Sequence, residues 1–157
     1  MRRPAACALI GAIALCLGMA RTPPGKEAND MKDVSRLMVT EASPSGWNGH
    51  DCGVTEPAAR VVEDAREWSS LWKEAFSAEA PPVDFEKHFA VAVFLGLRNT
   101  GGYSAEFLAP VADEGAVRIP YRERAPAASS FVIQAFTQPY AIQLYRKTSL
   151  RVKVERL

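Results

Sequence analysis

The sequence predicts a single α+β domain in which an antiparallel-dominated sheet of about seven strands packs against one amphipathic helix. Three observations lead to this fold class. Residues 89–95 form an uninterrupted apolar run, which is typical of a buried central strand. Residues 68–76 carry apolar side chains at helical spacing. From residue 103 onward, short stretches of alternating apolar and polar residues follow one another between turn residues.

Residues 1–20 have the order of a bacterial secretory signal peptide. Arg2 and Arg3 give a positive start, residues 5–17 are apolar, and Ala20 closes a site of small residues. We expect cleavage after Ala20 and export to the periplasm or the medium. The alternative is an uncleaved membrane anchor, but the apolar run is shorter than the roughly 20 residues of a spanning helix. No stable membrane insertion is therefore expected after cleavage.

Cys16 raises the further alternative of a lipoprotein. Leu15 stands directly before this cysteine, where a lipobox has a small residue, so lipid anchoring is not favoured. Residues 21–33 show no apolar period and are interpreted as a flexible tether. The folded domain is expected to cover residues 34–157.

The first part of this domain contains weaker signals. Residues 34–40 are predicted to form the first strand, and residues 59–63 the second. Between them, residues 42–57 are rich in proline and glycine and are interpreted as one irregular loop.

The helix is predicted over residues 64–77 and has sequence signals at both ends. Asp64 and Glu67 are spaced as an N-cap and a capping-box residue, and two prolines follow Ala80. One face of the helix is apolar and must pack on the sheet. Its residues are Trp68, Leu71, Trp72, Ala75 and Phe76.

The rest of the chain predicts a series of strands. Residues 103–109 and 117–122 are expected to form a hairpin across the turn at residues 113–115. Pro120 lacks an amide donor, so its strand should lie at a sheet edge or turn its unpaired side outward there. Further strands are expected at residues 131–136, 140–144 and 150–155. The short link at residues 146–149 predicts that the last two of these strands pair antiparallel.

Few residues of the mature chain suggest catalysis or metal binding. Cys52 is its only cysteine, and His50 and His88 are its only histidines. Their spacing matches no known metal motif, and no phosphate-binding glycine motif is present, so we expect no enzyme, metal or cofactor. A thiol enzyme centred on Cys52 and completed by His88 is a remote alternative. The net charge of +1 argues against nucleic acid as the main partner.

Two segments are the candidate surface for binding a partner protein. Glycine lets the backbone approach a partner closely, and a tyrosine offers a rigid ring with a polar end. The first segment consists of Arg98, Asn99, Thr100, Gly101, Gly102 and Tyr103, and the second of Thr137, Gln138, Pro139 and Tyr140. A purely structural role for both segments is the alternative interpretation. The sequence leaves the oligomeric state open.

Short motifs in a fixed order resemble the protease complex subunit PrcB family over roughly residues 61–154. They are Glu67-Trp68 with Leu71-Trp72, residues 81–85, residues 91–96, residues 100–103, Tyr121-Arg122-Glu123 with Pro126, and residues 137–140. The resemblance implies an exported, noncatalytic accessory domain that binds a protein partner. In the founding member that partner is a secreted subtilisin-like protease. The resemblance supplies no catalytic or binding residues.

A second, looser similarity concerns cysteine protease inhibitors of the chagasin type. Residues 99–103 are similar to the Asn-Pro-Thr-Thr-Gly-Tyr loop of these inhibitors, and residues 138–140 to their Arg-Pro-Trp loop. This similarity implies an inhibitor that inserts its loops as a wedge, which is the alternative function. The predicted amphipathic helix does not suit the β-sandwich of that family.

Overall fold

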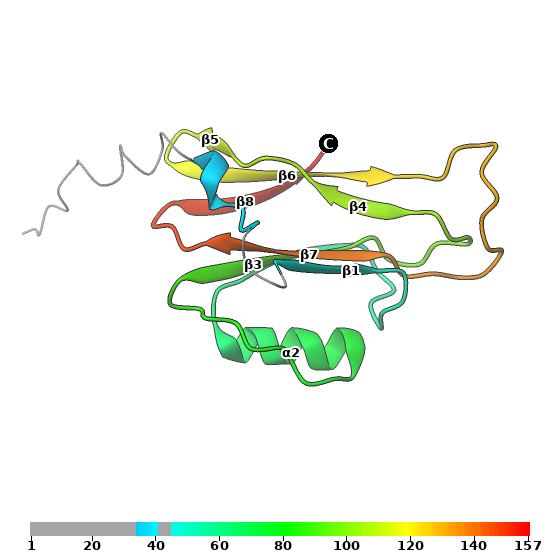
Figure 1. The fold of residues 1–157 in the computed structure, drawn as a ribbon, viewed down its shortest axis with the longest axis horizontal. Helices are drawn as coiled ribbons and strands as arrows, with labels where there is room; N and C mark the ends of the chain where they lie inside the picture. Colours follow the sequence, from blue (N-terminus) through cyan, green and yellow to red (C-terminus); the bar gives the residue numbers. More distant parts are fainter. Residues whose placement is uncertain (1–33, 41–44) are drawn as a thin grey trace, which may run out of the picture.

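A computed structural model describes residues 34–40 and 45–157, which form three layers (Figure 1). A four-stranded sheet lies in the middle, the helix α2 (Ala65–Phe76) covers one face, and a second sheet covers the other. The α+β class with one α-helix is confirmed for the described residues. The expected single sheet of about seven strands is wrong, because the eight strands in the described part of the chain divide into two sheets. The predicted signal peptide and tether lie outside the described residues.

The middle sheet is antiparallel throughout. Its strand order is β1 (Gly46–Gly49), β7 (Tyr140–Arg146), β3 (His88–Phe94) and β2 (Ala58–Val62). The predicted central strand is confirmed, since β3 lies between two neighbours and is buried from Phe89 onward. Both faces of this strand are covered, which explains why its sequence is apolar without alternation.

The outer sheet is built around β6 (Ala116–Arg124). β4 (Ser104–Phe107) and β5 (Val111–Asp113) pair antiparallel with successive parts of β6, while β8 (Arg151–Arg156) pairs with it in parallel. The predicted turn is present at residues 114–115, where both φ angles are positive. It joins β5 to β6, so the expected hairpin includes a short strand that the sequence did not reveal.

The predicted antiparallel pairing of the last two strands is wrong. β7 belongs to the middle sheet and β8 to the outer sheet, so the chain crosses from one layer to the other between them. Leu150 is buried in the core between the two sheets at this crossing. A short link therefore does not imply pairing when burial of such a residue draws the chain into another layer.

Pro120 does not mark a sheet edge, because β6 lies inside its sheet. The N–H of Leu108 donates to the carbonyl of Pro120 at 2.9 Å, so the backbone of Pro120 faces the side of β4 and β5. On that side, residues 108–110 oppose residues 119–120, between the paired stretches of β4 and β5. The proline thus stands at a bulge, where a missing donor interrupts no ladder.

The helix α2 is confirmed with its predicted cap. Asp64 Oδ1 accepts a hydrogen bond from the Glu67 N–H at 2.8 Å, and Ser77 ends the helix in the left-handed region at φ 51°. Trp68 and Leu71 are buried against the middle sheet, and Trp68 also packs on Trp47 of β1 with ring centroids 5.3 Å apart. No helix in the described ranges is long and apolar enough to cross a lipid bilayer.

Three sequence predictions fail in the less regular parts of the chain. Residues 34–40 form the 3-10 helix η1 (Val34–Leu37) and a single bridge from Met38 to Tyr145, not a strand. The described part of the expected loop at 42–57 contains the edge strand β1. Residues 131–136 form no strand and are instead an exposed loop. In each case the partner strand, which a local pattern does not show, decides the outcome.

Tyr145 carries a buried polar atom without a partner among the described residues. Its side chain is fully buried between the sheets and stacked on Phe89, with ring centroids 5.4 Å apart, and its hydroxyl makes no hydrogen bond to a described residue. Burial also raises the pKa of this hydroxyl. A buried hydroxyl that loses its water without gaining a partner lowers the stability of the fold.

We expect Tyr145→Phe to raise the free energy of unfolding by about 1 kcal/mol, because the ring is kept and the desolvated hydroxyl is removed. Chemical denaturation measures this change. Tyr121→Phe, at a half-buried position of β6, is the control and should change stability by less than about 0.5 kcal/mol. A less stable Tyr145→Phe protein would contradict the argument.

Candidate functional site

The structure brings the two candidate segments together at one end of the middle sheet. Arg98 and Thr137 form an antiparallel bridge, with N–H to carbonyl distances of 2.8 and 2.9 Å in the two directions. The hydroxyl of Thr137 donates to the carbonyl of Thr100 at 2.9 Å. Segments almost forty positions apart in the chain are thus joined into one surface element. Whether they contact a partner stays a prediction.

The second segment is mainly a buried support. Thr137 is only 5% exposed, and the carbonyl of Pro139 accepts a hydrogen bond from the N–H of Leu95 at 2.9 Å. Tyr140 begins β7, and its ring packs on Phe76 of the helix at 4.7 Å. Gln138 is half-buried and its N–H donates to the carbonyl of His50. These contacts hold the turn in place and leave little of this segment free for a partner.

The first segment is more accessible and is fixed by Arg98. The guanidinium of Arg98 makes two hydrogen bonds of 3.0 Å to the carboxylate of Glu123 on β6 and lies 5.5 Å from the ring centre of Tyr103. Side-chain exposure is 20% for Arg98 and 12% for Glu123. A bidentate, largely buried ion pair fixes the orientation of both side chains. Asn99 and Gly102 are exposed beside it.

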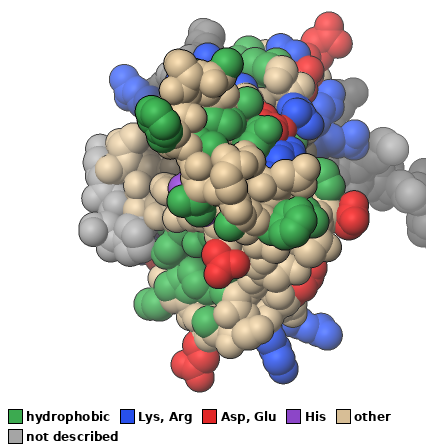
Figure 2. Space-filling view, turned by 90° about the vertical axis from the view of Figure 1, so that its right-hand side faces the viewer, with side chains coloured by type: hydrophobic (Ala, Val, Ile, Leu, Met, Phe, Trp, Pro, Cys, Tyr) green, Lys and Arg blue, Asp and Glu red, His purple; other side chains and the backbone are tan. Residues whose placement is uncertain are grey.

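The most exposed apolar side chains of this region were missed by the sequence prediction. Phe131, Ile133 and Phe136 are exposed by 106%, 66% and 70%, on a loop that we call the apolar loop (residues 131–136). The loop is tied to the first segment, since the N–H of Gly101 donates to the carbonyl of Ile133 at 3.0 Å. Figure 2 shows this end of the domain, where hydrophobic side chains lie in several groups.

The sequence contains a signal for the apolar loop. Residues 131–136 are apolar apart from Gln134, and such a run predicts a strand. The run lies between an Ala/Pro/Ser stretch and the Gln138-Pro139 pair, and both flanks disfavour regular pairing. These apolar side chains could belong either to a buried strand or to an exposed loop, and the structure shows that most of them are exposed.

An arginine cluster surrounds the end of β6 next to this loop. Glu106 accepts hydrogen bonds from Arg122 and Arg124, and Glu123 from Arg98 and Arg156. Each carboxylate is thus shared by two guanidinium groups, which leaves an excess of positive charge. The hydrogen bonds from Arg124 and then Arg122 lower the pKa of Glu106 to about 2. Basic side chains gather at the upper right of Figure 2.

The residues of the remote thiol-enzyme alternative do not come together. Cys52 is a buried free cysteine whose thiol donates to the carbonyl of Gln138 at 3.4 Å, next to the start of β7. His88 pairs with Arg146 at the far end of the same strand, about 20 Å away at 3.4 Å per residue. Burial is the main cause of the raised pKa of Cys52, which opposes thiolate formation. The described ranges contain no cluster of metal-binding side chains.

Comparison with known protein families gives a match in the second half of the chain. Residues 89–143 match the protein-family model described as PrcB C-terminal. The recognition of a PrcB-type domain from the sequence motifs is therefore confirmed over these residues, which include β3 except for His88, both glycines of the turn and the apolar loop. No curated protein and no solved structure matches the chain.

The Arg98–Glu123 pair can be tested by a double-mutant cycle. We expect Arg98→Leu to lower the free energy of unfolding by about 2 kcal/mol, because it removes two charge-assisted hydrogen bonds from a largely buried carboxylate. The change in the free energy of unfolding that Arg98→Leu causes should differ strongly between the wild-type protein and the Glu123→Gln protein. Denaturation of the four proteins measures this coupling.

The exposed Arg60–Glu74 pair is the matched control for this cycle. It has the same bidentate geometry, at 2.6 and 2.7 Å, but its side chains are 39% and 51% exposed. Its coupling should stay below about 1 kcal/mol. Equal coupling in the two pairs would mean that burial does not strengthen the Arg98–Glu123 interaction.

The low pKa of Glu106 predicts a pH dependence of stability. The folded pKa of about 2 lies below the usual 4.5, so the stabilisation is complete above pH 4.5 and is lost as the pH falls toward 2. The Glu106→Gln protein should lack this part of the acid-induced loss of stability, as measured by thermal unfolding between these pH values. The Glu56→Gln protein, changed at an exposed loop position, should lose as much stability on acidification as the wild type. Identical profiles for wild type and Glu106→Gln would contradict the prediction.

Proposed function

We propose that this protein is an exported, noncatalytic accessory domain that stabilises or regulates a partner protein. Its contact surface is the end of the domain where the apolar loop lies beside residues 98–103. The observation that carries the proposal is the exposure of Phe131, Ile133 and Phe136 on one short loop. Large apolar side chains that are exposed close together in the chain point to an interaction site on a folded protein.

Burial of these side chains against a partner would supply substantial binding energy. Fully burying one large apolar side chain contributes about 1.5–3 kcal/mol. The loop is anchored from two sides, through the Gly101–Ile133 hydrogen bond and through the bridge at Arg98 and Thr137. An anchored loop loses less conformational entropy on binding than a free one. Exposure and anchoring together favour a role in recognition.

The arginine cluster should favour a partner whose contact surface is negatively charged. Four guanidinium groups share two carboxylates around the end of β6, so a partner with an acidic rim would be attracted to this end. Such a rim would surround the apolar contact, as in most protein interfaces. A nearly neutral domain with one basic region fits a protein partner better than nucleic acid.

A secreted or periplasmic protease is the partner class that we propose. The match to the PrcB C-terminal family supports this class, and the N-terminal sequence pattern supports export. The loop-wedge inhibitor remains the second candidate function. The burial of Pro139 and the packing of Tyr140 on the helix weigh against it, because its second loop would have to be free to enter a cleft.

Site-specific photo-crosslinking in the native cell tests the contact surface. A photoreactive phenylalanine analogue at Phe131 or Phe136 should crosslink an exported protein, which mass spectrometry then identifies. Val111 is the control position, since it is 43% exposed but lies on β5 at the opposite end of the domain (Figure 1). The same crosslink from all three positions, or from none, would argue against this surface.

The combined change Phe131→Ser and Phe136→Ser separates binding from folding. We expect the crosslink partner to be lost, while thermal stability stays within about 0.5 kcal/mol of wild type because both side chains are exposed. Activity and lifetime of an identified protease, with and without this domain, then distinguish the functions. An accessory domain prolongs its lifetime or leaves turnover unchanged, whereas an inhibitor slows turnover.

A further inference from the structure

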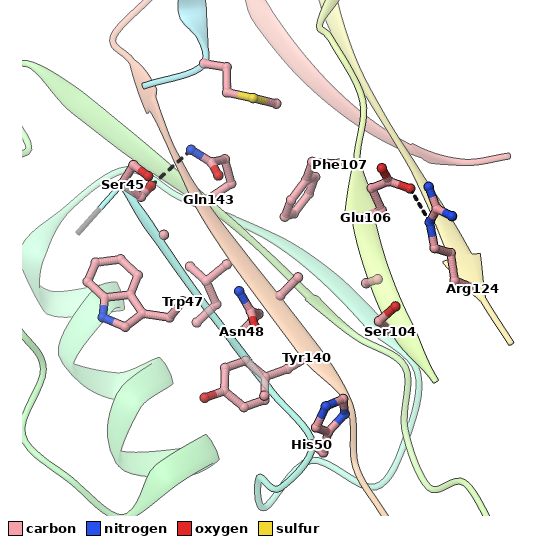
Figure 3. A pocket seen from close by; sticks show the side chains of 16 residues that line it. Ser45, Trp47, Asn48, His50, Ser104, Glu106, Phe107, Arg124, Tyr140 and Gln143 are labelled. Carbon is pink, nitrogen blue, oxygen red and sulfur yellow. Dashed lines mark hydrogen bonds and ion pairs between the residues drawn. The ribbon is translucent and has the colours of Figure 1, made fainter. Parts of the chain in front are cut away.

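A groove of about 550 Å³ lies between two edge strands, β1 of the middle sheet and β4 of the outer sheet (Figure 3). Phe107 points from β4 toward β7, while Glu106 on the same strand turns toward Arg124 of β6. The groove shares no residue with the apolar loop. It is therefore a separate candidate surface.

The free edge of β4 presents unpaired backbone groups to this groove. Leu108 donates to Pro120 of β6, and in an antiparallel pair the hydrogen-bonding residues alternate. Ser104 and Glu106 therefore direct their backbone groups toward β6. Ala105 and Phe107 direct theirs toward the groove. No described strand pairs with β4 on that side.

The floor of the groove is a part of the middle sheet that the outer sheet leaves uncovered. Trp47 of β1 packs toward the helix, so Gly46 and Asn48 belong to the opposite face, which also contains Ala141 and Gln143 of β7. β4 contacts β7 but stops short of β1. Two of these four floor residues, Gly46 and Ala141, have little or no side chain.

The space matches one missing strand. Neighbouring strands lie about 4.8 Å apart and packed sheets about 10 Å apart. A strand placed beside β4 would therefore lie above β1, over Gly46 and Asn48. It would widen the outer sheet by one strand, so that the outer sheet would also cover β1.

We propose that the groove binds an extended segment of a partner protein, which joins the free edge of β4 as a further strand. This mode gives affinity through main-chain hydrogen bonds and specificity through alternate side chains. The inference goes beyond the proposed function, because it concerns a different surface and a different kind of ligand.

Charge and shape define the chemistry of this segment. On the outer face of β4, Glu106 is shared by Arg122 and Arg124, which leaves one positive charge in excess and favours an acidic side chain next to them. On the inner face, Phe107 and Met38 border a floor in which Gly46 and Ala141 leave room for an apolar side chain. We therefore assign to the groove an extended segment in which apolar and acidic residues alternate.

Selection from a displayed library of linear peptides of about eight residues tests the proposal with the full-length protein as bait. Selected peptides should share the alternating apolar and acidic pattern, and their synthetic forms are then titrated by fluorescence anisotropy. Asn48→Trp fills the floor of the groove from an exposed position and should weaken binding at least about tenfold. Ala59→Trp, exposed on the opposite edge strand β2, is the matched control and should bind as wild type.

A second variant acts on the hydrogen bonds alone. Ala105→Pro removes one outward N–H and leaves the N–H groups that face β6 in place, so it should also weaken binding about tenfold. The backbone amides of Ala105 and Phe107 should exchange quickly in the free protein and slowly with peptide bound, as measured by residue-resolved hydrogen exchange.

Three results would overturn the proposal. They are the absence of any selected peptide, unchanged binding in both Asn48→Trp and Ala105→Pro, and amide protection at residues other than those of β4. The Phe131→Ser and Phe136→Ser protein should still bind the peptide with wild-type affinity. If it does not, the peptide binds the apolar loop, and the groove is excluded while the proposed function stands.

Discussion

Burial of β3 on both of its faces is the constraint on which the rest of this structure depends. Ala90, Ala92 and Phe94 pack in the core under the helix, whereas Phe89 and Val91 pack in the core between the sheets. A strand with two apolar faces needs a cover on each side. The helix supplies one cover and the outer sheet the other. The three-layer arrangement therefore follows from one apolar run.

The sequence predicts those features whose causes are local. The helix was found because its cap, its apolar stripe and its terminating prolines all lie within about twenty residues. The central strand was found because a run of apolar residues is visible without knowing its neighbours. In the candidate site, the structure brings the two selected segments into contact through Arg98 and Thr137, and their role in binding a partner stays a prediction.

The failures have long-range causes. β1 is short and rich in glycine, and it becomes a strand because Gly46 and Gly49 fit closely against β7, almost a hundred positions away. β8 leaves its sequence neighbour because β6 offers a parallel edge. Residues 131–136 are apolar apart from Gln134, as a strand can be, but they pair with no described strand. A local pattern shows which residues are apolar, but the available partners decide where they lie.

Some residues of the candidate site hold the apolar loop in position, and others expose their side chains on its surface. Leu95, at the end of the β3 run, donates to Pro139, and the Arg98–Thr137 bridge continues this contact toward the surface. The Gly101–Ile133 hydrogen bond then joins residues 98–103 to the apolar loop. Backbone hydrogen bonds therefore connect the buried strand, through the two predicted segments, to the exposed side chains that the sequence prediction missed. Changes in those segments would act through the position of the loop, whereas changes at Phe131 or Phe136 would alter the contact itself.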